Sequence, residues 1–101
     1  MNNIENTARQ LANSVLDELR SVDYDSEAVT LNQIYQLEAI SRVLACWVDP
    51  QDEAFDYAAS LIERMLGIGL IIRQSFRRRL EACYDRLAIA SGDVPKYAGC
   101  D

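Results

Sequence analysis

Apolar residues recur at every third or fourth position in four stretches of the chain, a spacing typical of amphipathic helices. The stretches span residues 4–21, 31–48, 50–66 and 70–90, with polar or glycine-containing segments between them. Short connections of this kind usually join helices that run in opposite directions. The pattern therefore predicts an all-α fold, a small four-helix bundle-like domain with up-down topology and short loops.

The same periodicity predicts which side chains face the core. In the first two helices they are Ile4, Ala8, Leu11, Ala12, Val15, Leu16 and Leu19, followed by Ile34, Leu37, Ile40, Ser41, Val43, Leu44, Trp47 and Val48. In the last two they are Ala54, Phe55, Ala58, Leu61, Ile62 and Met65, followed by Ile72, Phe76, Leu80, Cys83, Leu87 and Ala90. Each set forms a stripe along one side of its helix, which is what a shared hydrophobic core requires.

Capping residues indicate where two of the helices begin. Thr30 is followed three positions later by Gln33, the spacing of a capping box at the start of the second helix. Asp49 precedes Pro50, and proline disfavours helical backbone in the residue before it, so the second helix is expected to stop there. The third helix is then predicted to start at once, with Asp49 as N-cap and Pro50 as its first residue.

Glycines indicate where the last two helices end. Gly67 is predicted to terminate the third helix and Gly92 the fourth. Because a glycine inside a helix costs only about 1 kcal/mol, one long kinked helix in place of the third and fourth is an alternative. The domain is expected to span residues 1–92, and residues 93–101 are expected to form a short, loosely ordered tail.

The composition argues against an enzyme. The chain contains no histidine, so it lacks the commonest general base and the commonest metal ligand. Its one lysine, Lys96, lies close to the C-terminus, which is a poor position for a preorganised catalytic group. No cofactor, metal ion or small-molecule substrate is therefore expected.

The cysteines and the apolar segments predict a cytoplasmic protein. Cys46, Cys83 and Cys100 are odd in number and far apart, unlike the cysteines of a disulfide-rich secreted domain. The N-terminus has no signal-peptide pattern. The longest apolar run, residues 65–72, is far shorter than the roughly 20 residues that a bilayer span needs.

Five arginines fall within residues 73–87 of a chain whose net charge is -6. On a helix they divide: Arg79 and Arg86 flank the apolar stripe, while the outer surface combines Arg73, Arg77 and Arg78 with Glu81 and Asp85. We interpret these arginines as partners for the protein's own carboxylates, because Arg suits bidentate carboxylate pairing. The alternative is a nucleic-acid contact made by Arg73, Arg77, Arg78 and Arg86, which the net negative charge disfavours.

Acidic residues gather at the start of the third predicted helix, at Asp49, Asp52, Glu53 and Asp56. Helix capping and the helix dipole account for acids at such a position. The alternative is an acidic interaction surface, which could extend to the acids of residues 17–27 and imitate the phosphates of a nucleic acid. Tyr35 and Tyr57 are further candidates to anchor a partner.

The fourth predicted helix begins with a segment that is apolar on every side, where Ile68, Leu70 and Ile71 are candidates for an oligomer interface. A homodimer would cover them. The alternative is that the loop and the end of the second helix around Trp47 cover them within one chain.

These features predict a non-enzymatic, small acidic helical protein that binds, and inhibits or regulates, a macromolecular partner. An inhibitor of a host protein complex, of the type that phages and mobile elements encode, is one example. A protein partner and a homodimer are expected, and contact with a membrane is not. The alternative function is a nucleic-acid-associated regulator that uses the arginine-rich fourth helix.

Overall fold

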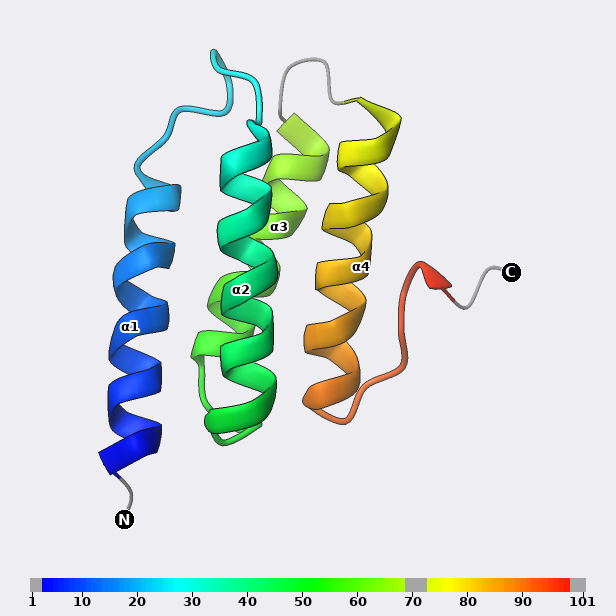
Figure 1. Ribbon diagram of the computed structural model, residues 1–101. Helices are drawn as coiled ribbons and strands as arrows, with labels where there is room; N and C mark the ends of the chain where they lie inside the picture. The colour runs from blue at the N-terminus through cyan, green and yellow to red at the C-terminus, as the bar shows by residue number, and fades with distance from the viewer. Residues whose placement is uncertain (1–2, 69–72, 99–101) are drawn as a thin grey trace.

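A computed structural model describes residues 3–68 and 73–98, and the predicted all-α fold is confirmed. The described residues form the helices α1 (Asn3–Arg20), α2 (Leu31–Trp47), α3 (Ala54–Ile68) and α4 (Gln74–Ala90). Consecutive helices run in opposite directions, as the up-down prediction requires (Figure 1). Since α3 and α4 are separate helices of opposite direction, the alternative of one long kinked helix is wrong.

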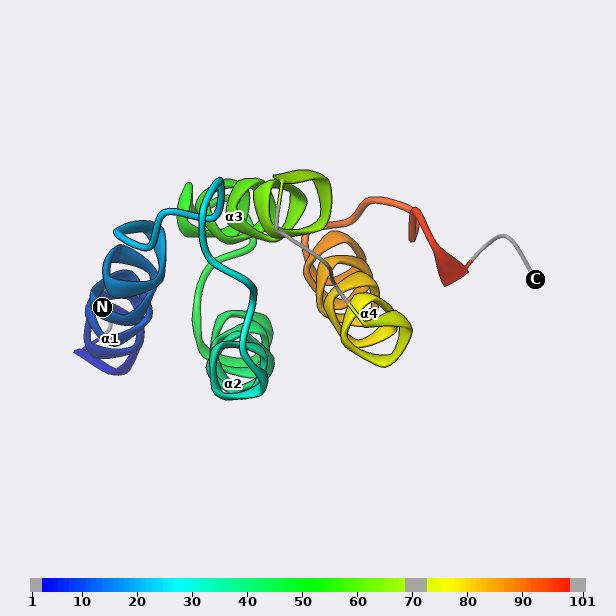
Figure 2. The same cartoon turned by 90° about the horizontal axis from the view of Figure 1, so that it is seen from above.

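The bundle is flattened, with Cα extents of 43 × 33 × 17 Å. Seen end-on, α1 and α4 lie at the outer corners, with α2 on one side between them and α3 crossing obliquely on the other (Figure 2). Helix α1 therefore packs against both α2 and α3, and so does α4. Each corner helix has two neighbours, which leaves part of its circumference uncovered.

The predicted core positions of α2, α3 and α4 are largely confirmed, except for Ile72, which lies outside the described residues. Ile34, Leu37, Leu44, Leu61 and Ile62 are among the buried apolar side chains. The polar side chains among the described buried residues are bonded within the domain. The hydroxyl of Ser41, for example, donates to the carbonyl of Glu38 at 2.9 Å. The spacing of apolar residues along the chain was therefore sufficient to predict most buried positions of α2, α3 and α4.

Helix α1 and the end of α2 differ from the prediction. Ile4, Leu11 and Trp47 were expected to face the core, yet their side chains are 61%, 56% and 55% exposed. The buried residues of α1 are Ala12, Leu16 and Leu19, which belong to the predicted stripe and are confirmed. A corner helix buries a narrower stripe than a helix with neighbours on three sides, so the apolar residues at the edge of the stripe remain in solvent.

The third helix begins later than predicted. Residues 50–53 form a turn, and the carboxylate of Asp49 accepts the N–H of Gln51 at 2.8 Å. The cap is Asp52, whose carboxylate accepts the N–H of Ala54 at 2.9 Å. The prediction that Asp49 and Pro50 start the helix is therefore wrong. Two aspartates are available near this end of the helix, and the later one accepts the first helical N–H, that of Ala54. The predicted end is also wrong, since the helix continues through Gly67 to Ile68.

Two other boundaries match their predicted caps. Thr30 and Gln33 form a complete capping box, with distances of 2.9 and 3.2 Å. After α4, Gly92 has a φ of +93°, a left-handed conformation that favours glycine. The N–H of Gly92 donates to Ile89 and the N–H of Asp93 donates to Ala88, which together satisfy the last carbonyls of the helix.

The C-terminal tail is attached to α4 by a buried carboxylate. Asp85 was expected on the outer surface, but it is only 6% exposed. It accepts backbone N–H groups of Lys96 at 2.7 Å, Tyr97 at 3.1 Å and Ala98 at 2.7 Å. The ring of Tyr97 also packs edge-on against Tyr84 at 5.6 Å. Residues 96–98 are therefore held on the domain, and a loose tail is not what the structure shows for them.

Candidate functional site

The arginines of α4 were predicted to meet the protein's own carboxylates, and Arg79 does so. Its Nε and Nη2 donate to the two carboxylate oxygens of Glu38 on α2, at 2.9 and 2.7 Å. These hydrogen bonds hold the pKa of Glu38 below its usual range. The guanidinium of Arg79 also lies 4.9 Å from the ring centre of Tyr35. This bidentate pair connects α2 to α4.

Two further arginines of α4 bond to groups of the chain that carry no charge. Arg86 donates to the hydroxyl of Ser41 at 3.0 Å. Arg77 donates to the carbonyl of Leu66, near the end of α3, at 3.0 Å. Both side chains are only partly exposed. They therefore serve contacts between helices in addition to any outward role.

The remaining nucleic-acid candidates, Arg73 and Arg78, are exposed. The guanidinium of Arg73 lies 5.7 Å from the ring centre of Phe76. The four candidates thus do not form a row of free cations, since the two described above donate inward. The sequence prediction of a nucleic-acid contact on α4 has no continuous basic strip to support it.

The predicted acidic cluster divides into two pairs with different surroundings. Asp49 and Asp52 serve the turn before α3, and Asp52 also pairs with Arg9 at 3.3 Å. Glu53 and Asp56 are exposed, and their carboxylates make no hydrogen bond or ion pair with the other described residues. Glu53 and Asp56 both border a groove, which makes them the half of the cluster that can meet a partner.

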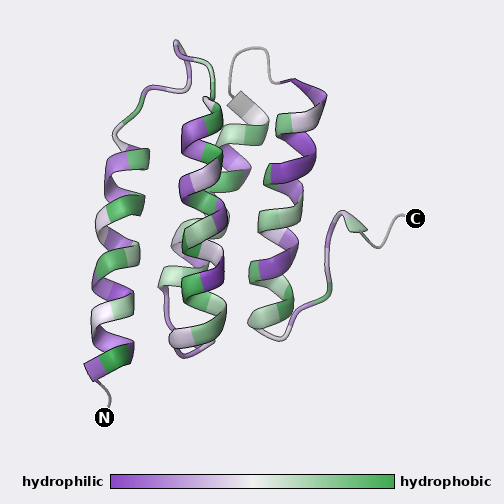
Figure 3. Cartoon of the chain, viewed as in Figure 1, coloured by the Kyte–Doolittle hydropathy of each residue, from purple (hydrophilic) through white to green (hydrophobic). Residues whose placement is uncertain are grey.

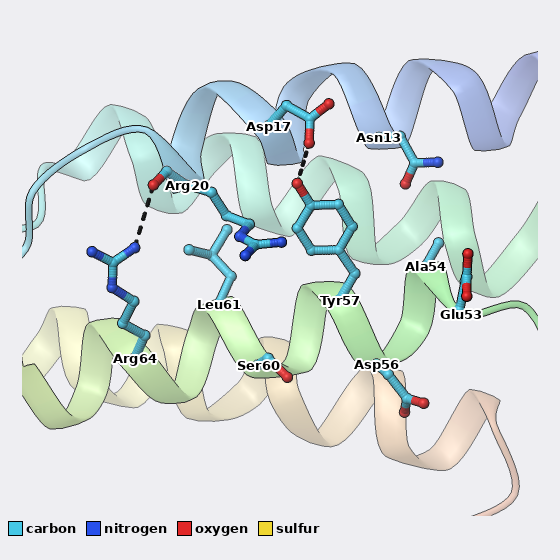
Figure 4. A pocket seen from close by; sticks show the side chains of 10 residues that line it. All are labelled: Asn13, Asp17, Arg20, Glu53, Ala54, Asp56, Tyr57, Ser60, Leu61 and Arg64. Atoms are coloured by element: carbon cyan, nitrogen blue, oxygen red, sulfur yellow. Dashed lines mark hydrogen bonds between the residues drawn. The ribbon is translucent and has the colours of Figure 1, made fainter.

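This groove, which we call the charged groove, lies between α1 and α3 and has a volume of about 800 Å³ (Figure 4). Its wall is built from one polar side of each helix, at residues Asn13, Asp17, Arg20, Glu53, Ala54, Asp56, Tyr57, Ser60, Leu61 and Arg64. Ala54 and Leu61 are buried and form its apolar floor. Helices α1 and α3 run in the same direction, and their polar residues lie side by side along the groove (Figure 4).

Tyr57 crosses the middle of the charged groove. Its hydroxyl donates a hydrogen bond to the carboxylate of Asp17 on the opposite helix (Figure 4). That bond raises the pKa of Tyr57, because the phenol holds its proton against a carboxylate. The guanidinium of Arg20 lies 4.6 Å from the centre of the Tyr57 ring, a cation–π arrangement. An aromatic ring, an acid and a base therefore meet at one point of the surface.

One end of the charged groove is basic and is connected to the end of α1. Arg64 donates to the carbonyls of Arg20 and Val22 at 3.3 and 3.5 Å, and its guanidinium lies 5.3 Å from the ring centre of Tyr24. The hydroxyl of Tyr24 donates to the carbonyl of Leu19 at 2.9 Å, and burial raises the pKa of Tyr24 to about 12. A cation at the C-terminus of a helix compensates its unpaired carbonyls.

The other end of the charged groove is acidic. Glu53 lies at the wall, and Asp56 points outward from α3 at the rim (Figure 4). Asp56 and Arg64 are eight residues apart on α3, which corresponds to about 12 Å along a helix. The groove can thus offer hydrogen-bond acceptors at one end and donors at the other, with the Tyr57 ring between them.

Part of this groove was predicted. Glu53, Asp56 and Tyr57 were candidates, and Asp17 was among the acids of residues 17–27. Asn13, Arg20, Ser60 and Arg64 were not predicted. The available signal was the repeat of polar residues at positions 13, 17 and 20 and at positions 53, 57, 60 and 64, each of which marks one side of a helix. The sequence could not show that these two sides face each other.

The predicted oligomer interface falls mostly outside the described residues. Leu70 and Ile71 lie there, and of Ile68 only its position as the last residue of α3 is described. Trp47, the last residue of α2, lies at the opposite end of the bundle from Ile68, the last residue of α3 (Figure 1). What covers Leu70 and Ile71 falls outside the described residues.

The helices described here, over residues 3–68 and 73–98, do not include one with the length and apolar character that a membrane crossing demands. Within the same residues, no three histidine, cysteine or acidic side chains converge as ligands for a metal ion. Comparison of the chain with protein-family models, with curated proteins and with solved structures finds no match.

Proposed function

We propose that this protein is a non-enzymatic interaction protein that binds, and thereby inhibits or regulates, a protein partner in the cytoplasm. The charged groove is the proposed contact surface. The observation that supports it is the pair of carboxylates, Glu53 and Asp56, which stay exposed without an ion pair in the described chain while their neighbours cap a helix.

The groove suits a segment that carries a basic side chain. An Arg or Lys of the partner would lie toward Glu53 and Asp56, and an acidic group toward Arg20. Complementary charges of this kind increase association rates and select against partners with the opposite order. Tyr57 would provide aromatic contact area at the centre, the role in which tyrosine is enriched at interfaces.

The test is capture of the partner by immobilised protein at near-physiological salt, with quantitative mass spectrometry as the readout. The groove variant is Glu53→Gln/Asp56→Asn, which keeps side-chain shape and removes two charges. The control variant, Asp25→Asn/Glu27→Gln, removes the same charge from the exposed segment between α1 and α2. Loss of two pairs worth about 0.7 kcal/mol each corresponds to about a tenfold drop in affinity.

We expect the wild type and the control variant to retain the same protein, and the groove variant to lose it at equal thermal stability. Equal retention by both variants would contradict the proposal. A titration with duplex and single-stranded DNA across a salt series tests the alternative function. Binding at low salt that Arg73→Gln/Arg78→Gln abolishes would replace our proposal with a nucleic-acid contact.

A further inference from the structure

A second groove, between α1 and α2, has the opposite character. Ile4, Leu11 and Trp47 are each more than half exposed, although they are the kind of side chain that usually lies inside. With Asn3, Thr7, Ala8 and Val43 they line a groove of about 410 Å³, which we call the neutral apolar face. Hydrophobic positions recur along α1 and α2 where they lie side by side (Figure 3). Apolar side chains gathered on one side of a domain are the kind of surface that protein contacts bury.

The described parts of the chain lie away from this face. The tail residues 96–98 are bonded to Asp85 on α4, which is the corner helix farthest from α1 (Figure 2). The segment between α1 and α2 lies at the other end of the bundle from Ile4 and Trp47 (Figure 1). None of the described residues, 3–68 and 73–98, covers the face, so we looked for its cover in a second molecule.

The lack of charge on this face indicates which molecule that is. None of its seven residues is charged, in a chain of which 26% is charged and whose net charge is -6. The charged residues of the first half of α1 turn toward the segment before α3: Glu5 accepts the N–H of Asp49 at 3.0 Å, and Arg9 pairs with Asp52 at 3.3 Å. Two copies of an acidic protein repel each other, and a contact through an uncharged surface adds no close pair of like charges to that repulsion. A basic partner, by contrast, would gain nothing from charges on this face, because there are none.

The stripe on α1 is also self-complementary. Ile4, Thr7 and Leu11 are spaced as neighbours on one side of a helix, with Thr7 between the two large side chains. When two copies of such a helix cross in antiparallel fashion near Thr7, Ile4 of each copy meets Leu11 of the other. An isologous interface has this property, since residue i contacts j and j contacts i.

We propose that the neutral apolar face binds a second copy of this chain, through antiparallel packing of α1 on α1 with Trp47 covering the ends of the contact. The sequence predicted a homodimer through Ile68, Leu70 and Ile71, and this inference assigns the contact to different residues. The charged groove lies on the other side of α1, so a dimer of this form leaves both charged grooves open.

Sedimentation velocity between about 1 and 200 µM tests the dimer. The variant is Leu11→Glu, and the matched control is Ile89→Glu, which places the same charge on an apolar side chain of α4 that is 59% exposed. We expect the wild type and the control to dimerise with the same Kd, and Leu11→Glu to raise the Kd at least about tenfold, because one buried unpaired charge costs more than 1.4 kcal/mol. Ile4→Gln, a milder change on the same stripe, serves if Leu11→Glu does not fold.

Disulfide trapping tests the geometry. In a background with Cys46→Ser and Cys100→Ser, we expect Thr7→Cys to form a covalent dimer at least about tenfold faster than Ser60→Cys, which is exposed in the charged groove. A faster rate is the consequence of a Thr7 pair within the short Cα separation that a disulfide needs.

The fluorescence of Trp47, the single tryptophan, gives a third readout and should shift to shorter wavelength as the dimer forms. A wild type that stays monomeric at 200 µM would overturn the inference, as would equal loss of dimer in Leu11→Glu and Ile89→Glu. Capture of a different protein through Leu11 by a monomeric wild type would also overturn it. Partner capture through Glu53 and Asp56 is measured separately, so either proposal can fail without the other.

Discussion

One helix, α1, borders two grooves of opposite kinds. Toward α2 it presents Ile4 and Leu11, and the groove there has no charge. Toward α3 it presents Asp17 and Arg20, and that groove is charged from end to end. Both grooves flank the same buried stripe, which includes Leu16. The difference shows that the apolar stripe of α1 is wider than its own core requires, and that the excess lies on one side only.

The two surfaces would recognise partners by different physics. Burial of an apolar face is non-directional and depends on shape, so it suits a permanent contact. A charged groove orders its donors and acceptors, so it suits discrimination among partners and is weakened by salt. A protein that uses one side of α1 for self-association and the other for a partner would separate these two tasks.

The largest expected effect on stability distinguishes Leu16, the buried leucine of α1, from Leu11, the exposed one. Leu16→Ala should lower the free energy of unfolding by about 2.5–5 kcal/mol, because the side chain is fully buried and leaves a cavity. Leu11→Ala should change it by less than about 0.5 kcal/mol in the monomer. Urea denaturation at about 1 µM protein measures both. A large loss for Leu11→Ala at this concentration would mean that the neutral apolar face is covered within one chain.

The next largest effect on stability distinguishes Asp52, which bonds to other groups of the domain, from Asp56 in the charged groove. Asp52→Ala should cost about 1–2 kcal/mol, because it removes the cap of α3 and the partner of Arg9. Asp56→Ala should cost less than about 1 kcal/mol, since it removes only a favourable interaction with the helix dipole. Thermal unfolding of the two variants gives the comparison. Equal losses would show that Asp56 is also needed for folding and is not a free group of the charged groove.

A smaller effect concerns the hydrogen bond across the charged groove. Tyr57→Phe should cost about 0.5–1 kcal/mol. Because the folded pKa of Tyr57 is raised, the bond contributes its full stability below the ordinary tyrosine pKa near 10, and this is lost as the pH rises through the folded value. Asp17→Asn should lower the pKa of Tyr57, measured by ultraviolet titration of the phenolate. An unchanged titration in Asp17→Asn would show that the two side chains do not meet in solution.

The smallest expected effect on stability concerns the ion pair of Glu38 and Arg79, which lies outside both grooves. The pKa of Glu38 is lowered by Arg79, so this pair contributes stability above the ordinary glutamate pKa near 4.3 and loses it as the pH falls through the folded value. Glu38→Gln should therefore lower the free energy of unfolding at pH 7. The variant should also lose less stability than the wild type as the pH falls below 4.5. Denaturation curves from pH 3 to 7 test this. A decline that Glu38→Gln leaves unaltered would assign the acid sensitivity to other carboxylates.

Local patterns determined the helices and most of the core. A capping box such as that of Thr30 and Gln33 involves residues three positions apart, and the same is true of the glycine cap at Gly92. The buried seams of α2, α3 and α4 follow from helical periodicity alone. These features could be predicted because each depends on neighbours along one helix.

The tertiary structure decided the burial and the contacts of the polar residues and of the apolar residues at the edge of a stripe. Whether Leu11 is inside or outside depends on how many helices surround α1, which periodicity does not specify. Asp85 is buried because backbone N–H groups of residues 96–98 arrive from the tail. The charged groove exists because α1 and α3 lie side by side, although residues 17 and 57 are far apart in the chain. A sequence determines which side of its own helix each residue occupies, but only the packing of helices determines what that side meets.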